Sequence, residues 1–69
     1  MKKNDIFIVN KNFVLDNGSV PCGATIEIQD YNNYLNKYEI IITPYIKDGE
    51  RTSIKLFVEQ DFIITNGEQ

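Results

Sequence analysis

The sequence predicts an all-β fold, a small five-stranded antiparallel barrel, on three observations. Ala24, Ile26 and Ile28 alternate with polar residues, a period of two that is typical of a strand with one buried face. Short segments rich in Gly, Pro, Asn and Asp separate such stretches, as turns do. No long window shows the i, i+3, i+4 apolar spacing of a helix. Closure into a barrel is expected because it removes free strand edges.

A single domain over residues 1–69, ordered from about 5 to 65, is all that 69 residues allow. The first strand region covers residues 6–15, interrupted by Asn-Lys-Asn at 10–12. The turn Asp-Asn-Gly at 16–18 ends it, with Gly18 expected at positive φ. This region is apolar on both faces. We expect Ile6 and Ile8 to face inward, and either Phe7 or Val9 to face outward.

The rest of the chain supplies the other strands. Residues 30–37, DYNNYLNK, are polar and are expected to form a loop or hairpin connection. Strands follow at 38–43, with Tyr38, Ile40 and Ile42 on one face, and at 53–59, with Ile54, Leu56 and Val58 on one face. A short turn at 59–61 precedes a last strand at 62–65, in which Phe62 and Ile64 face inward, and residues 66–69 form a frayed tail.

The hairpin around Asp48-Gly49 raises a question of register. A two-residue turn there pairs Lys47 with Glu50, which sets inward side chains opposite outward ones further along the hairpin. Inward residues meet if Ile40 pairs with Val58 and Ile42 with Leu56. Either the turn is longer than two residues, or an irregularity near Pro44, which cannot donate a ladder hydrogen bond, absorbs the difference.

The chemistry that most enzymes use is missing from the sequence. It has no histidine, so the commonest general base and metal ligand is absent. The single cysteine, Cys22, is interpreted as a small buried apolar residue rather than a nucleophile. Paired carboxylates at Asp48 and Glu50, and at Glu59 and Asp61, do not match a calcium loop. We therefore expect no catalytic residue, no cofactor and no metal site.

The charge and the cysteine content limit which partners and which cellular compartment we expect. Seven basic residues against ten acidic ones give a net charge of −3, which disfavours binding to nucleic-acid backbones. A lone cysteine cannot form an internal disulfide, and this favours a reducing compartment. No apolar run is long enough for a signal peptide or a membrane span. The expected location is the cytoplasm, with no membrane partner.

The order of features resembles the SH3-like barrels of small bacterial and phage proteins. The stretches that carry the likeness are "VPCGATIEI", residues 20–28, and "KLFVEQDFI", residues 55–63, and the likeness in the order of features covers nearly the whole chain. The resemblance implies a small barrel and leaves the ligand open. An acidic, aromatic-rich loop for proline-rich peptides, a tryptophan and a basic KOW-like signature are all missing. The abundance of Ile, Asn and Lys also favours a bacterial or phage source.

The expected register places Ile41 directly opposite Phe57 on the outside of the hairpin. Phe7 and Ile63 are expected to join them, because both terminal segments are apolar on two faces and the chain is short. These four residues are the candidate partner-binding surface. The leading hypothesis is a non-catalytic protein-interaction module, of the kind found among phage or mobile-element accessory proteins, that binds a host protein or a second copy of itself.

The alternative hypothesis is a small barrel that binds nucleic acid. Single-stranded nucleic acid stacks on aromatic side chains beside a positively charged groove. The candidate residues for such a platform are Tyr31, Tyr34, Tyr38, Tyr45, Lys37, Lys47 and Arg51.

Overall fold

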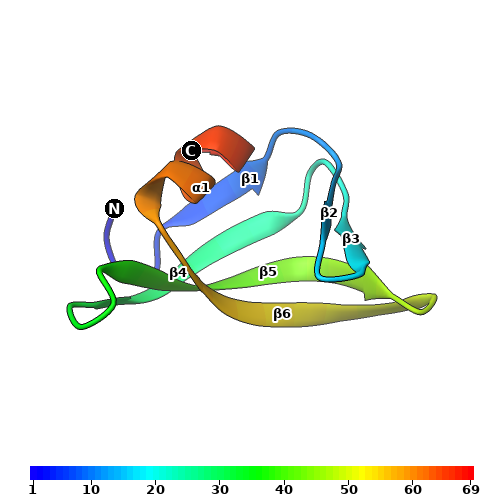
Figure 1. Ribbon diagram of the computed structural model, residues 1–69. Helices are drawn as coiled ribbons and strands as arrows, with labels where there is room; N and C mark the ends of the chain where they lie inside the picture. The colour runs from blue at the N-terminus through cyan, green and yellow to red at the C-terminus, as the bar shows by residue number, and fades with distance from the viewer.

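A computed structural model describes all residues from 1 to 69, and it is mostly β structure with one short helix (Figure 1). Seven strands form one antiparallel sheet, rather than the expected five. The elements are β1 (Ile6–Val9), β2 (Phe13–Leu15), β3 (Gly18–Val20), β4 (Thr25–Asn32), β5 (Lys37–Lys47), β6 (Glu50–Val58), α1 (Gln60–Asn66) and β7 (Gly67–Glu68).

Strand β5 is the centre of the sheet. It pairs with β4 over most of its length, with β3 near its end and with β6. Strand β1 pairs with both β4 and β7, and β2 pairs only with β3. Strand β6 pairs with β5 alone, so the sheet is open along β6. In Figure 1, β4, β5 and β6 form the lower layer, and β1 and α1 lie above it.

The β2–β3 hairpin corrects the expectation for Gly18. The turn residues Asp16 and Asn17 both have positive φ, 51° and 65°, as a type I′ turn requires. The short polar side chains of Asp and Asn tolerate this conformation. Gly18 is instead the first residue of β3 and is buried, because the ring of Tyr45 lies where a Cβ would stand. Its lack of a side chain therefore serves packing and not the turn.

Strands β4 and β5 extend into the polar segment at 30–37. Only residues 33–36 form the connection, since Asn32 pairs with Lys37 and Tyr31 with Tyr38. A register shift between Ile28 and Asp30 leaves Gln29 as an extra residue on β4. The polar composition of residues 30–37 therefore correctly predicted a hairpin connection, but the predicted loop was longer than the observed one.

The β5–β6 hairpin has a two-residue turn, with Asp48 and Gly49 at φ 54° and 79°. The predicted irregularity near Pro44 is confirmed, because the register shifts between Ile42 and Tyr45. The predicted residue pairs, Ile40 with Val58 and Ile42 with Leu56, are wrong.

Beyond that shift, Ile40 pairs with Leu56, Ile42 with Ile54, and Tyr38 with Val58. The extra residue lies on β5, whereas the predicted pairs required it on β6. An extra residue on either strand places inward side chains opposite inward partners. The apolar pattern of the sequence therefore did not show which strand carries it.

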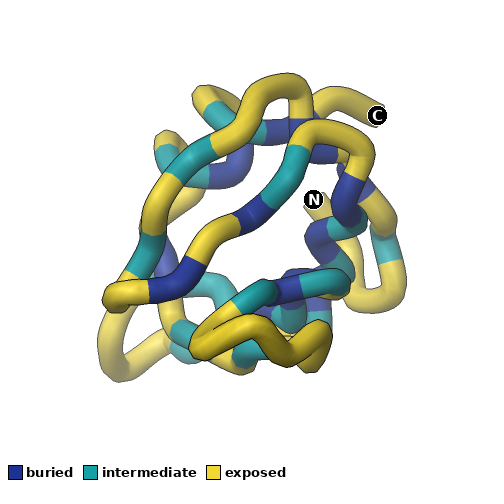
Figure 2. The backbone as a smooth tube through the Cα atoms, turned by 90° about the vertical axis from the view of Figure 1, so that its right-hand side faces the viewer, coloured by how far each residue is buried: buried dark blue, intermediate teal, exposed yellow.

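The core lies on the inner face of the sheet, beneath β1 and α1, and Figure 2 shows the buried positions alternating with exposed ones along the chain. The predicted inward faces of β4 and β5 are confirmed. The buried side chains that form the core are Phe7, Val9, Val20, Ala24, Ile26, Ile28, Ile40, Ile42, Tyr45, Val58 and Ile63.

Strand β1 has the opposite orientation to the expected one. Phe7 and Val9 are buried, whereas Ile6 and Ile8 are 51% and 46% exposed. The cause is the pairing with β4: Phe7 lies opposite Ile26, whose side chain points into the core. Because directly paired residues share a face, Phe7 must also point inward. The composition of β1 gave no preference, since both of its faces are apolar.

The last predicted strand is a helix. Residues 62–65 lie within α1, where Ile63 is fully buried, Phe62 is half-buried and Ile64 is exposed. The β-branched residues favour a strand, but packing of Ile63 into the core outweighs this local preference. Gly67 then begins β7 and approaches the side chain of Phe7 closely, so the predicted frayed tail is partly an ordered strand.

Candidate protein-interaction surface

Four apolar side chains lie on the side of the sheet that faces away from the core. We call this set, Ile6, Ile8, Ile41 and Phe57, the outer face. Ile6 lies opposite Glu27, Glu27 opposite Ile41, and Ile41 opposite Lys55, so one row crosses β1, β4, β5 and β6. Paired residues share a face. The row therefore alternates apolar and charged side chains across the sheet.

Ile41 and Phe57 are diagonal neighbours on this face, not directly opposite as expected. Ile41 pairs with Lys55, and Phe57 pairs with Glu39, two residues further along each strand. The correction follows from the extra residue on β5. Diagonal neighbours are about 7–8 Å apart, still within reach of an aromatic ring. Phe57 is 44% exposed and Ile41 is half-buried, so both remain on the outside.

Polar groups surround the apolar side chains and bond to one another. Lys55 Nζ lies 3.4 Å from Glu39 Oε2, across the β5–β6 pair. The hydroxyls of Thr43 and Ser53 lie 2.9 Å apart, and the Thr25 hydroxyl donates to the Thr43 carbonyl at 3.3 Å. No element of the chain packs over this polar network. The four apolar residues of the outer face thus lie among polar side chains that are accessible to solvent.

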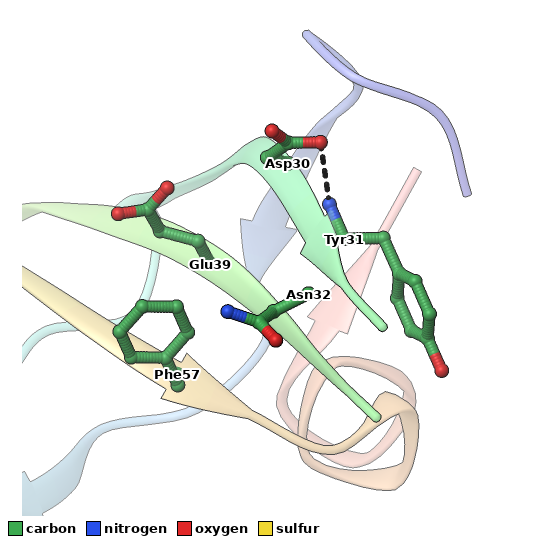
Figure 3. Close-up of a pocket in the computed structure, with 5 residues that line it drawn as sticks. All are labelled: Asp30, Tyr31, Asn32, Glu39 and Phe57. Atoms are coloured by element: carbon green, nitrogen blue, oxygen red, sulfur yellow. Dashed lines mark hydrogen bonds between the residues drawn. The ribbon is translucent and has the colours of Figure 1, made fainter. Parts of the chain in front are cut away.

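A pocket lies beside Phe57, lined by Asp30, Tyr31, Asn32, Glu39 and Phe57 (Figure 3). The extra residue Gln29 brings Asp30 opposite Glu39. Two carboxylates directly opposite each other repel. The Asp30 carboxylate accepts a hydrogen bond from the Tyr31 N–H at 2.8 Å, and Lys55 offsets the charge of Glu39. The Phe57 ring forms one wall of this acidic pocket, and Figure 3 shows it next to the Glu39 side chain.

Two of the predicted partner-binding residues do not lie on the surface. Phe7 is 8% exposed and Ile63 is fully buried, so placing them outside was wrong. The sequence neighbours of Phe7, which are Ile6 and Ile8, lie on the outer face instead, and sequence reasoning assigns these to the core. The alternation of β4 could have found them once β1 was aligned against it, because Glu27 and Thr25 face outward opposite Ile6 and Ile8.

The tyrosines of the alternative hypothesis do not form one platform. Tyr31 and Tyr38 contact edge to face at the β4–β5 hairpin, with ring centroids 4.8 Å apart, and Tyr34 at its tip is 99% exposed. Tyr45 is 4% exposed and belongs to the core. Of the basic candidates, only Lys37 lies beside that hairpin; Lys47 and Arg51 flank the other one, at the far end of β5.

The remaining chemistry is sparse. No three side chains of the metal-binding types gather into a group. Cys22 is a free thiol that is exposed, so its expected burial was wrong; its backbone N–H donates to Asn12 Oδ1 at 2.6 Å. The one helix is too short and too polar to cross a membrane.

No protein-family model matches the chain, and comparisons with curated proteins and with solved structures find no match. The geometry of the surface is therefore the basis for a functional proposal.

Proposed function

We propose that this protein is a non-catalytic interaction module that binds a protein partner through the outer face. One observation carries the proposal: Ile6, Ile8 and Phe57 are about half exposed on the outer side of one hydrogen-bonded sheet, which also carries Ile41, and no element covers them. Isolated exposed apolar residues are normal on a protein surface. Here Ile41 and Phe57 are neighbours with a polar surround, which is typical of a binding site.

The chemistry of this surface suits a protein interface. Interfaces combine an apolar, often aromatic centre with a polar rim, and aromatic residues contribute a large share of binding energy. Here Phe57 and Ile41 supply the centre. Glu27, Glu39 and Lys55 supply the rim, so a partner with apolar side chains flanked by polar ones fits it.

We further propose that the architecture is that of the small SH3-like barrels. Support comes from the order of pairing: β4, β5 and β6 form a meander, a one-helix connection follows, and β7 returns to pair with β1. The free, exposed Cys22 suits a reducing cytoplasm. Together with the composition, these features support a role as a bacterial or phage accessory protein.

Capture of partners from a bacterial lysate on the immobilised protein tests this function. The variant carries Ile41→Thr and Phe57→Lys, which alter the outer face and leave the core side chains in place. Ile64→Lys is the matched control, because Ile64 is 57% exposed but lies on α1. We expect the control to capture the same protein as the parent, and the double variant to lose it while melting close to the parent temperature.

Two results would count against the proposal. If the double variant unfolds, Ile41 and Phe57 contribute to the core and are not free for a partner. A second arm uses fluorescent single-stranded oligonucleotides, since binding that weakens steeply with salt is the signature of phosphate contacts. Such binding, lost on Tyr31→Ala or Tyr34→Ala but kept in the double variant, would support the nucleic-acid alternative in its place.

A further inference from the structure

Strand β6 presents a free edge along nine residues. It pairs with β5 on one side, and no strand pairs with its other side. Every second residue of an edge strand directs its N–H and C=O away from the sheet, where they can pair with another strand. Mean strands are about 5–6 residues long, so this edge is long for an uncovered one.

Two of the devices that usually protect such an edge, proline and a bulge, are missing from β6, and its three charged residues are Glu50 and Arg51 near its start and Lys55 near its middle. Proline and strand bulges interrupt edges, and charged side chains repel an incoming strand. The proline and the extra residue of this hairpin both lie on β5. The one charge in the middle of β6, Lys55, has an ion-pair partner in Glu39 of β5, on the side away from the free edge. The edge is therefore open to a further strand.

The inner side of β6 is also incompletely covered. Ile54 and Leu56 point to the core side, yet both are only half-buried, whereas Ile40 and Ile42 opposite them on β5 are fully buried. A strand added to the edge of β6 would extend the inner apolar layer past Ile54 and Leu56. Both the backbone and the side chains of β6 thus lack a neighbour on the same side.

We propose that a second copy of this chain fills that position, with β6 pairing antiparallel to β6 of the partner about a two-fold axis at Ile54. In a two-fold pair, inward residues meet inward residues only if the paired numbers sum to an even value. Centring the axis on Ile54 pairs Glu50 with Val58 and uses all nine residues of β6. An axis at Lys55 or Leu56 would give a shorter ladder. Residue 50 or 51 would then extend beyond the partner's β6 and lie opposite the start of the partner's α1.

The positions of the charged residues on β6 favour the same register. An axis at Lys55 would place the two copies of that lysine directly opposite each other, which is unfavourable. The axis at Ile54 puts Lys55 opposite Ser53 and Arg51 opposite Phe57, where a cation can lie on the ring. It also brings Arg51 diagonal to Glu59, and every such contact occurs twice. No like charges are directly opposed in this arrangement.

The two-fold axis of an antiparallel strand pair is perpendicular to the sheet, so both outer faces point to the same side. The dimer would therefore join two outer faces into one surface, with Phe57 of each copy near the seam. Such a surface presents two equivalent binding positions, and avidity raises the affinity for a repetitive or symmetric partner. The pairing itself does not depend on the partner proposed above.

Sedimentation equilibrium over a range of protein concentrations tests the pairing through residue 53. Ser53 is exposed, and in this register it lies opposite Lys55 of the second copy. Ser53→Glu should lower the dimer dissociation constant by about fivefold and Ser53→Lys should raise it by about fivefold, because the pair occurs twice. Both variants lose the same hydroxyl contact to Thr43, so each controls for the other. A parent chain that stays at 8.0 kDa at every concentration, or equal shifts in both variants, would overturn the proposal.

Cross-linking tests the position of the axis independently of dimer strength. With Cys22→Ser as background, Ile54→Cys places two thiols opposite each other at the axis, within the Cα distance that a disulfide spans. Thr52→Cys is the matched control: its two copies would be offset by four residues, roughly 13 Å along the strands. We expect a covalent dimer only from Ile54→Cys under mild oxidation. Equal cross-linking of both variants, or of neither, contradicts an axis at Ile54.

Discussion

The Tyr45 ring lies directly against Gly18, and its hydroxyl reaches the carbonyl oxygens of Leu15 at 2.7 Å and Asp16 at 2.9 Å. These contacts tie the β2–β3 hairpin to β5. The backbone pairing between the two parts is slight, a single Cα partner pair of Ser19 with Ile46. Tyr45 and the absence of a side chain at residue 18 therefore help to hold the small hairpin, together with the buried Val20 and the edge-to-face contact of Phe13 with Phe62.

Gly18→Ala should destabilise the protein by about 2 kcal/mol, because the new methyl group would overlap the Tyr45 ring and displace it from the hairpin carbonyls. Thermal or urea unfolding measures the effect. Ser19→Ala is the control, since Ser19 is exposed and should change stability by less than about 0.5 kcal/mol. Equal stability of the two variants would mean that the ring has room to move.

The role of Gly18 illustrates what local sequence could and could not predict. Asp-Asn-Gly correctly predicts a turn, but the local sequence assigns the positive φ to the glycine, whereas Asp16 and Asn17 adopt it. The contact that requires glycine comes from Tyr45, distant in sequence, so no local pattern contains it. The alternation of β4 and β5, by contrast, was sufficient to predict their inward faces, because each strand is apolar on one side only.

Ile42→Ala should cost about 2–5 kcal/mol, the range for a fully buried side chain that leaves a cavity. In dilute solution, where the chain is monomeric, Leu56→Ala should cost less, because Leu56 lies on the open edge strand and is half-buried. Unfolding by urea compares the two. A larger loss for Leu56→Ala in dilute solution would contradict this order. At higher protein concentration the dimer proposed above covers the edge of β6, so the cost of Leu56→Ala should rise.

The orientation of β1 leads to a matched pair of substitutions at adjacent positions. Phe7→Ala should destabilise the fold by about 3–5 kcal/mol, because Phe7 is buried against the core. Ile6→Thr should change stability by about 0.5 kcal/mol or less, since Ile6 is half exposed and threonine keeps the β-branched shape. The free energy of unfolding is the readout, and the reverse order would restore the orientation expected from sequence.

Ile64→Ala should leave stability unchanged or raise it by about 0.4 kcal/mol. Ile64 is exposed on α1, and alanine has the higher helix propensity. In a strand the same change would lower stability, because alanine is a poor strand former. Unfolding measurements, with far-ultraviolet circular dichroism as a check on the helix, separate the two cases.

The candidate site was predictable only in part. As for α1, tertiary packing rather than local sequence decides which residues are buried. Ile41 and Phe57 were expected outside from the alternation of their strands, and they lie outside. Phe7 and Ile63 come from short segments that are apolar on every side, so their burial depends on which neighbour they pack against. That neighbour is β4 for Phe7 and the core beneath α1 for Ile63, and neither follows from local composition.

The most direct test of the outer face is a nuclear magnetic resonance titration of isoleucine methyl groups with the captured partner. Isoleucines report on each region separately: Ile6, Ile8 and Ile41 on the outer face, Ile54 on the β6 edge, and Ile64 on α1. We expect the methyl signals of Ile41, Ile6 and Ile8 to shift or broaden on addition of partner, while that of Ile64 stays in place. Shifts at Ile64 with Ile41 unchanged would contradict binding through the outer face.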